Sequence, residues 1–317
     1  GLKVFCYNRN TGNLIWERDV NNIEDSPSTP PETTDDTGLA APSVTTDGNY
    51  VIAIFGTGDI IAFDMQGNRQ WARNLGVPDN HYGHSSSLIM LKEKVFVQFD
   101  TNKGGKLIAM NSRTGETIWE VKRDTQISWA SPILAKVNGK HQVVLSSAPL
   151  VAGYDAETGK ELWSNRCMMG EVGPSPAFGE GLVFATNEYA SLVAIDPTTG
   201  ETVWEDNEYM PEVASPVVSE GLLFIATTYG VFVCYDAKDG TKYWEQEFND
   251  GFYSSPIVAD GKVYASTMNG TTHIMEVSKE PTIRNQPKLG EQIVTTPAFA
   301  EGNIYIRGEE NLYCIGK

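Results

Sequence analysis

The sequence has little positive charge. Among 317 residues, Lys and Arg number 24 and Asp and Glu number 41, which gives a formal net charge of −17 and an isoelectric point near 4.6. Proteins that bind nucleic acid or anionic lipid need a basic surface, so this balance argues against both classes. It favours a cationic partner or simply high solubility.

Long apolar runs and closely spaced cysteines are also missing. No run of about 18 apolar residues occurs, so we predict no transmembrane segment. The opening GLKVFCYNRN has no signal region, and we expect a chain that is not exported or whose signal has been removed. The cysteines are too few and too far apart for a metal motif, a redox motif or a disulfide-stapled fold. They are Cys6, Cys167, Cys234 and Cys314.

Catalytic signatures and helical periodicity are equally scarce. The sequence contains no Ser-His-Asp spacing, no phosphate-binding glycine loop and no paired acid–base motif. No segment sustains a helical pattern with caps, so we expect very little helix.

What the sequence does contain is a repeat. Six of the seven tryptophans occupy one repeat position, at spacings of 55, 48, 44, 41 and 40 residues. The copies resemble AIDPTTGETVW and CYDAKDGTKYW, in which Asp and Gly mark a tight turn before the tryptophan. Because the tryptophan recurs at one fixed position of the repeat, we predict that it has a structural role between neighbouring repeats. These residues are Trp16, Trp71, Trp119, Trp163, Trp204 and Trp244.

A second motif, Ser or Thr followed by Pro, precedes most copies, as at Ser175-Pro176 and Ser215-Pro216. Pro42 and residues 85–87 occupy the equivalent places in the first two copies. Each unit reads as four strands. In residues 214–246 they are ASPVV, LLFIATT, VFVCYD and TKYWEQ, separated by turns.

Four-stranded units of 40–48 residues that repeat about seven times predict an all-β fold, a β-propeller of antiparallel blades in a single domain over 1–317. We expect seven blades, in a ring closed by pairing the C-terminal three strands with the N-terminal outer strand. The alternative is eight blades, of which the first lacks two strands. A polar, Pro-rich, acidic insertion at 21–41 is either loosely packed or a flap over one face.

Cys6, Cys234 and Cys314 fall at a third-strand position that elsewhere holds Ala or Gly, so we interpret them as buried structural thiols. A bridge between Cys6 and Cys314 remains open. Asp79, His81 and His84 form an Asp-x-His-x-x-His sequence that fits no strong metal motif, and we assign no metal site.

Two sets of loops open on one face of a propeller, beside the central channel. The loops that enter the inner strands and those between second and third strands supply aromatic and acidic residues, which suit a cationic side chain or a sugar. Asp59, Asp100 and Asn269 also lie in these loops. Our candidate face is His81, Tyr82, His84, Trp129, Glu171, Glu188, Tyr189, Tyr209, Glu212, Tyr229, Phe252 and Tyr253.

The repeat S-P…D-x-x-T-G-x-x-x-W is similar to that of the pyrroloquinoline-quinone (PQQ)-type propeller family. That family includes quinoprotein alcohol dehydrogenases and BamB-like outer-membrane assembly lipoproteins, and the resemblance implies export to the periplasm or outer membrane. In the family that this sequence resembles, the dehydrogenases are larger rings, and an adjacent Cys-Cys pair lies over their quinone. This sequence has no such pair, so we predict no cofactor.

The resulting functional hypothesis is a non-catalytic, monomeric scaffold of the bacterial cell envelope that binds protein partners through its loops. A propeller that binds a small ligand or glycan is the alternative. A quinone-dependent dehydrogenase is the second alternative.

Overall fold

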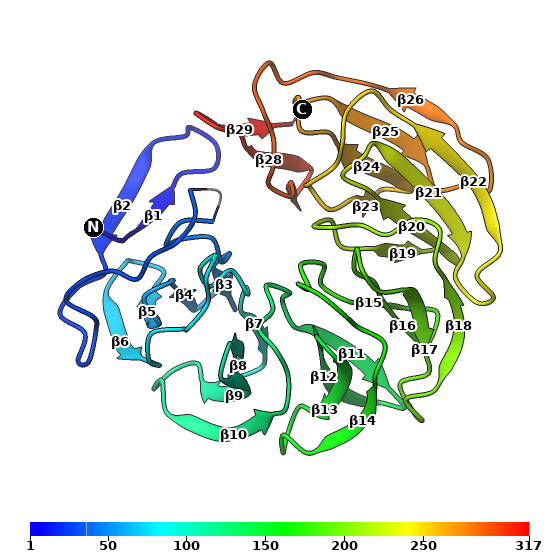
Figure 1. Ribbon diagram of the computed structural model, residues 1–317. Helices are drawn as coiled ribbons and strands as arrows, with labels where there is room; N and C mark the ends of the chain where they lie inside the picture. Colours follow the sequence, from blue (N-terminus) through cyan, green and yellow to red (C-terminus); the bar gives the residue numbers. More distant parts are fainter. Residues whose placement is uncertain (36, 317) are drawn as a thin grey trace.

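Antiparallel sheets surround a common centre in the computed structural model, which describes residues 1–35 and 37–316 (Figure 1). Every secondary-structure element within these residues is a β-strand, so the all-β prediction is confirmed. Six sheets have four strands, each ordered as a simple meander.

The bounds of the complete sheets follow the chain. The first two comprise β3 (Thr45–Thr46), β4 (Tyr50–Ile54), β5 (Asp59–Asp64) and β6 (Arg69–Asn74), then β7 (Ile89–Leu91), β8 (Lys94–Thr101), β9 (Gly104–Asn111) and β10 (Thr117–Arg123). The next two comprise β11 (Ile133–Val137), β12 (Lys140–Ser147), β13 (Leu150–Asp155) and β14 (Glu161–Asn165), then β15 (Ala177–Gly179), β16 (Leu182–Ala185), β17 (Leu192–Ile195) and β18 (Thr202–Asp206). The last two comprise β19 (Val217–Ser219), β20 (Leu222–Ala226), β21 (Val231–Asp236) and β22 (Lys242–Glu247), then β23 (Ile257–Ala259), β24 (Lys262–Ser266), β25 (Thr272–Glu276) and β26 (Ile283–Asn285).

Two incomplete sheets stand at the chain ends. β27 (Ala298–Ala300), β28 (Asn303–Arg307) and β29 (Leu312–Ile315) form one, and β1 (Lys3–Tyr7) with β2 (Leu14–Asp19) forms the other. Counting β27, seven sheets begin with a short inner strand, which confirms the seven blades of a β-propeller.

The predicted closure of the ring is wrong. Among the described residues β2 pairs with β1 and β29 pairs with β28, and no strand pairing joins the two sheets. Arg9 in the β1–β2 turn instead forms an ion pair with Glu301 in the β27–β28 turn. The β1–β2 hairpin packs on the following sheet through Trp16, as the outer strands of the other sheets do through their tryptophans.

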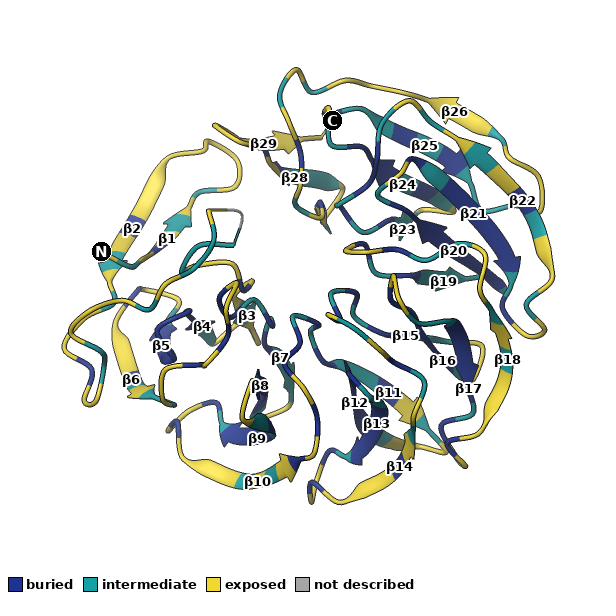
Figure 2. Ribbon diagram, viewed as in Figure 1, coloured by how far each residue is buried: buried dark blue, intermediate teal, exposed yellow. Residues whose placement is uncertain are grey.

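The repeated tryptophans hold neighbouring blades together, as predicted. The indole of Trp204 donates to the carbonyl of Ala237 at 3.0 Å, and Gly240 leaves room for its ring. Trp16, Trp71, Trp119 and Trp244 donate in the same way to the following blade. The core therefore consists of layers between sheets, and Figure 2 shows buried middle strands behind exposed outer ones.

The Ser/Thr-Pro motif also links blades. The backbone N–H of each motif serine donates to the side-chain hydroxyl of the next motif, over distances of 2.9–3.0 Å. The first member is Ser43 rather than the expected Pro42, and the second is Ser87. The belt runs through Ser43, Ser87, Ser131, Ser175, Ser215, Ser255 and Thr296.

The insertion at 21–41 packs on the ring, in agreement with the flap alternative for its described residues; residue 36 lies outside them. Ile23 is buried, Ser26 donates to Asp59 at 2.8 Å, and the backbone N–H of Thr34 reaches the carbonyl of Tyr82 at 3.4 Å. The segment therefore borders the loop that carries His81 and Tyr82.

The cysteines are all free thiols. Cys234 is fully buried, in agreement with a structural role, and burial raises the pKa of its thiol to about 12. Cys314 is exposed, contrary to our interpretation, because its sheet has no fourth strand to cover it.

Candidate functional site

An aromatic cluster forms where the loops before β7 and β11 meet. The ring of His81 lies 4.3 Å from that of Tyr82 and 5.4 Å from that of Trp129, and Tyr82 and Trp129 are 5.1 Å apart. The Trp129 indole donates to the carbonyl of Gly83 at 3.1 Å, which fixes the two loops together. The one tryptophan outside the repeat therefore joins two predicted face residues.

Carboxylates adjoin this cluster. Glu171 lies 3.1 Å from His81 Nε2 and raises the pKa of Tyr82 through its charge and a hydrogen bond. Glu188 likewise raises the pKa of Tyr189, with smaller contributions from Glu212 and Glu171.

The aromatic rings and the acids together form one exposed surface. Tyr189 is 63% exposed and Met169, just before Glu171, is 62% exposed. We name this surface the acidic aromatic face and define it as His81, Tyr82, Trp129, Met169, Glu171, Glu188, Tyr189 and Glu212.

Tyr229 and Tyr209 contact residues outside this face. Tyr229 is 58% exposed in the β20–β21 loop, beside Met210. The Tyr209 hydroxyl turns away to Glu245 on the outer strand β22, and Lys242 lies over its ring at 4.8 Å. Tyr253 is half-buried.

The prediction that His84 and Phe252 belong to the candidate face is wrong, because both side chains turn inward and are buried. His84 packs on Phe99 with ring centroids 5.5 Å apart, and burial lowers its pKa to about 4. Phe252 is fully buried against Phe248 and Phe232.

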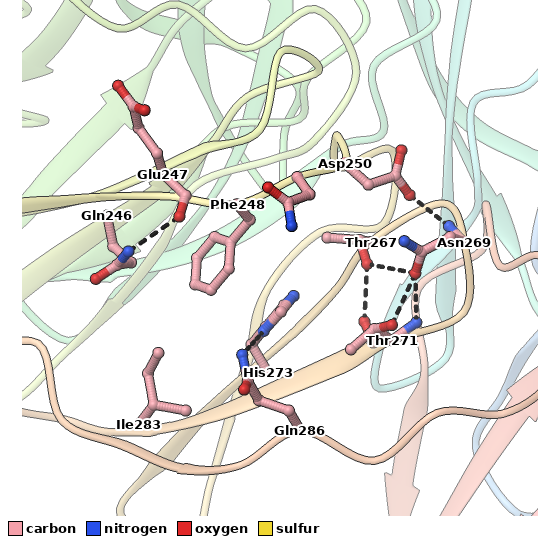
Figure 3. A pocket seen from close by; sticks show the side chains of 11 residues that line it. Gln246, Glu247, Phe248, Asp250, Thr267, Asn269, Thr271, His273, Ile283 and Gln286 are labelled. Atoms are coloured by element: carbon pink, nitrogen blue, oxygen red, sulfur yellow. Dashed lines mark hydrogen bonds between the residues drawn. The ribbon is translucent and has the colours of Figure 1, made fainter.

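A polar cavity that the sequence did not predict lies beside Phe248 and His273 (Figure 3). It measures about 450 Å³ and lies between the segment 246–250, the β24–β25 turn and β26. Its lining mixes amides, carboxylates, hydroxyls, one imidazole and one phenyl ring. Of the residues that line it, only Asn269 was in the loops singled out from the sequence.

His273 lines this polar cavity. It is 6% exposed, its ring lies 3.9 Å from that of Phe248, and its Nδ1 is 2.8 Å from Nε2 of Gln286. Burial lowers the pKa of His273, so the ring is neutral at pH 7. Figure 3 shows its second ring nitrogen on the side of the ring away from Gln286.

The residues present do not fit the quinone apparatus of the dehydrogenases. The four cysteines lie on different sheets or loops, so no vicinal pair can form. Within the described part of the chain, no three His, Cys, Asp or Glu side chains are grouped as metal ligands. Asp79 faces Asn102 and Lys103, whereas His81 faces Glu171, so the Asp-x-His-x-x-His sequence does not converge.

A family profile for outer membrane protein assembly factor BamB matches residues 1–128, 103–215 and 189–285. The chain belongs to this family. Its members carry the PQQ-like repeat, so the predicted resemblance is confirmed. A quinohemoprotein alcohol dehydrogenase, ADH-IIG of Pseudomonas putida, is 31% identical over 120 residues, which are 34% of this chain and 16% of that enzyme.

Solved structures of both branches share the fold. BamB from Moraxella catarrhalis superposes with a TM-score of 0.74 and 17% identity over 98% of this chain and 87% of the other. A europium-containing methanol dehydrogenase gives 0.72 and 14% over 98% and 78%. A quinohemoprotein alcohol dehydrogenase from Comamonas testosteroni gives 0.73 and 13% over 96% and 67%. At these identities the likeness concerns the fold alone. Within the described residues, no helix is long and apolar enough to cross a membrane.

Proposed function

We propose that this protein is a non-catalytic scaffold of the bacterial cell envelope, which binds a protein partner through the acidic aromatic face. The observation that carries the proposal is the exposed run of Tyr82, Met169 and Tyr189 beside Glu171 and Glu212. Large exposed aromatic side chains supply contact area at interfaces, and carboxylates around them select a basic partner.

The family supports the same conclusion. The matching profile is named for an outer membrane protein assembly factor, and the related BamB structure covers nearly the whole chain. Our proposal therefore includes a location at the periplasmic side of the outer membrane and a partner in outer-membrane protein assembly that presents Lys or Arg among apolar side chains.

Site-specific photo-crosslinking tests this proposal. A benzoylphenylalanine placed at Tyr189 or Tyr82 should give one defined adduct in the intact envelope. The same group at Ile118, which is 46% exposed on the outer strand β10, is the matched control and should give none. Purified partner should then bind at least 10-fold more weakly to Tyr189→Ala. Equal crosslinking from all three positions would contradict the proposal.

The polar cavity favours a second function, binding of a small neutral sugar. Its amides and the neutral His273 offer hydrogen bonds, while Phe248 offers an apolar surface. Calorimetric titration with maltotriose and chitotriose tests this, with Gln286→Ala as the weakened variant and Gln70→Ala, far along the chain and exposed, as the control. If neither sugar produces heat with a protein that still crosslinks to its partner, sugar binding is excluded and the scaffold proposal is unaffected.

The dehydrogenase alternative has a direct test as well. Titration with PQQ and Ca²⁺, followed by dye-linked alcohol oxidation, should show neither a bound-quinone spectrum nor turnover if the protein is a scaffold.

A further inference from the structure

The interface between sheet β23–β26 and sheet β27–β29 differs from the other blade interfaces. At six others, a tryptophan of the outer strand pairs with a small third-strand residue, as Trp204 pairs with Ala194 and Trp244 with Cys234. At the same register Asn285 pairs with Ile274. Here the third strand carries the larger side chain and the outer strand the smaller one, which reverses the usual order. No indole enters this interface.

An apolar cavity of about 310 Å³ lies at this place. Its walls correspond in register to the residues around Trp244. Phe224 and Phe232 contact that indole, and Tyr264 and Thr272 are their equivalents in the next blade. Val263 and Met275, from the facing sheet, correspond to Ile304 and Ile315. All four equivalents line the cavity, together with Ile274 and Asn285.

We infer that this cavity binds a free, planar, apolar aromatic molecule of about the size of an indole. The same set of wall positions encloses an indole one blade earlier, so the shape complementarity is built into the repeat. The volume is within the range of small-ligand sites, and an aromatic guest would bury apolar area without leaving a charge unpaired. Strand β26 already occupies the outer position (Figure 1), so a partner's strand cannot add there and a free molecule is favoured.

Ligand-observed fluorine NMR with 5-fluoroindole tests this inference. The wild-type protein should broaden the probe signal saturably. The double variant Ile274→Ala/Asn285→Trp restores the Ala–Trp pair of the other interfaces and should weaken probe binding at least 10-fold, because its own indole fills the space. Ile274→Ala alone enlarges the cavity and should retain binding.

Two further variants separate the site from nonspecific effects. Thr272→Phe introduces the residue that stands at the equivalent register in β21 and should also reduce binding, which provides a test if the double variant does not fold. Ile118→Trp adds an indole on the exposed outer strand β10 and should leave binding unchanged. No saturable binding to wild-type protein, or equal binding to the filled variants, would overturn the inference; a tryptophan peptide that binds where 5-fluoroindole does not would overturn it in favour of a protein partner.

Discussion

The backbone N–H of Ser175 donates to Oγ of Ser215 over 2.9 Å, and this bond joins two neighbouring blades at their inner ends. The donor belongs to the residue before Pro176, and the acceptor to the residue before Pro216. Because proline has no N–H, the preceding residue supplies the donor that links the blades at this point.

Ser215→Ala should therefore destabilise the ring. The change leaves the N–H of Ser175 without its acceptor at a half-buried position, at a cost of about 1 kcal/mol. Urea unfolding followed by tryptophan fluorescence measures the loss. Ser215→Thr is the matched control, because Thr296 fills the same role for Ser255 in the native belt. Equal destabilisation by Ala and Thr would show that the hydroxyl bond does not matter.

The approach of Gly240 to Trp204 gives a second prediction. A Cβ at Gly240 would lie 2.7 Å from the indole, so Gly240→Ala must displace a ring that is fixed between two blades. Overpacking of this kind costs about 1–3 kcal/mol.

Gly221→Ala is the control for that measurement. Both glycines have a φ of +75°, but a Cβ at Gly221 meets nothing within 4 Å. Both variants therefore share the strain of the left-handed backbone, about 1–2 kcal/mol, and only Gly240→Ala adds the clash. If the two variants unfold at the same urea concentration, the indole does not pack against Gly240 as described.

The repeat made much of this architecture predictable. Trp204, Gly240 and the Ser–Pro pairs recur at fixed spacing, and a short-range pattern that repeats specifies both the strand and the place where it meets its neighbour. Residues outside the repeat were predicted less well, because their surroundings depend on how loops fold over the blades.

Asp100 illustrates what the sequence could not show. It stands where a loop carboxylate was expected, yet Arg123 forms a fully buried ion pair with it at 2.6 Å. The two residues become neighbours only through the pairing of β8, β9 and β10. His84 and Phe252 were misplaced for the same reason, since a loop pattern does not tell which side chains turn inward. The sequence already contains Ile274 and Asn285 in place of the usual small residue and tryptophan. That they form the equivalent pair can be recognised only once the strand register is known.

Gln142 provides a third prediction, because it replaces the usual acceptor of a repeat tryptophan. Trp163 Nε1 donates to Gln142 Oε1 at 2.7 Å, and Gln142 Nε2 donates to the carbonyl of Pro197 at 3.1 Å. Gln142→Met keeps the approximate side-chain volume but leaves the indole N–H of Trp163 and the carbonyl of Pro197 unpaired. Each unpaired buried group should lower the free energy of unfolding by about 1–3 kcal/mol. Thermal unfolding should show a lower midpoint for Gln142→Met and almost none of that change for the exposed Gln70→Met. A midpoint that equals the wild-type value would mean that water replaces the amide.

The fourth prediction concerns pH and His84. Burial lowers the folded-state pKa of this imidazole from 6.5 to about 4, although the nearby charge of Asp100 opposes the shift. Between these values the unfolded chain binds a proton that the folded chain does not, so stability is complete above pH 6.5 and falls as the pH drops towards 4. From pH 7.5 to pH 5 the loss due to His84 should be about 2 kcal/mol.

His84→Gln carries no titrating ring, so its free energy of unfolding should fall less over the same interval, by about that amount. Urea unfolding at pH 7.5 and pH 5 measures the difference, and His273 cancels because both proteins retain it. Parallel pH profiles for wild type and His84→Gln would mean that the buried imidazole accepts its proton without unfolding, and that a charge at this depth in the blade is compensated by Asp100.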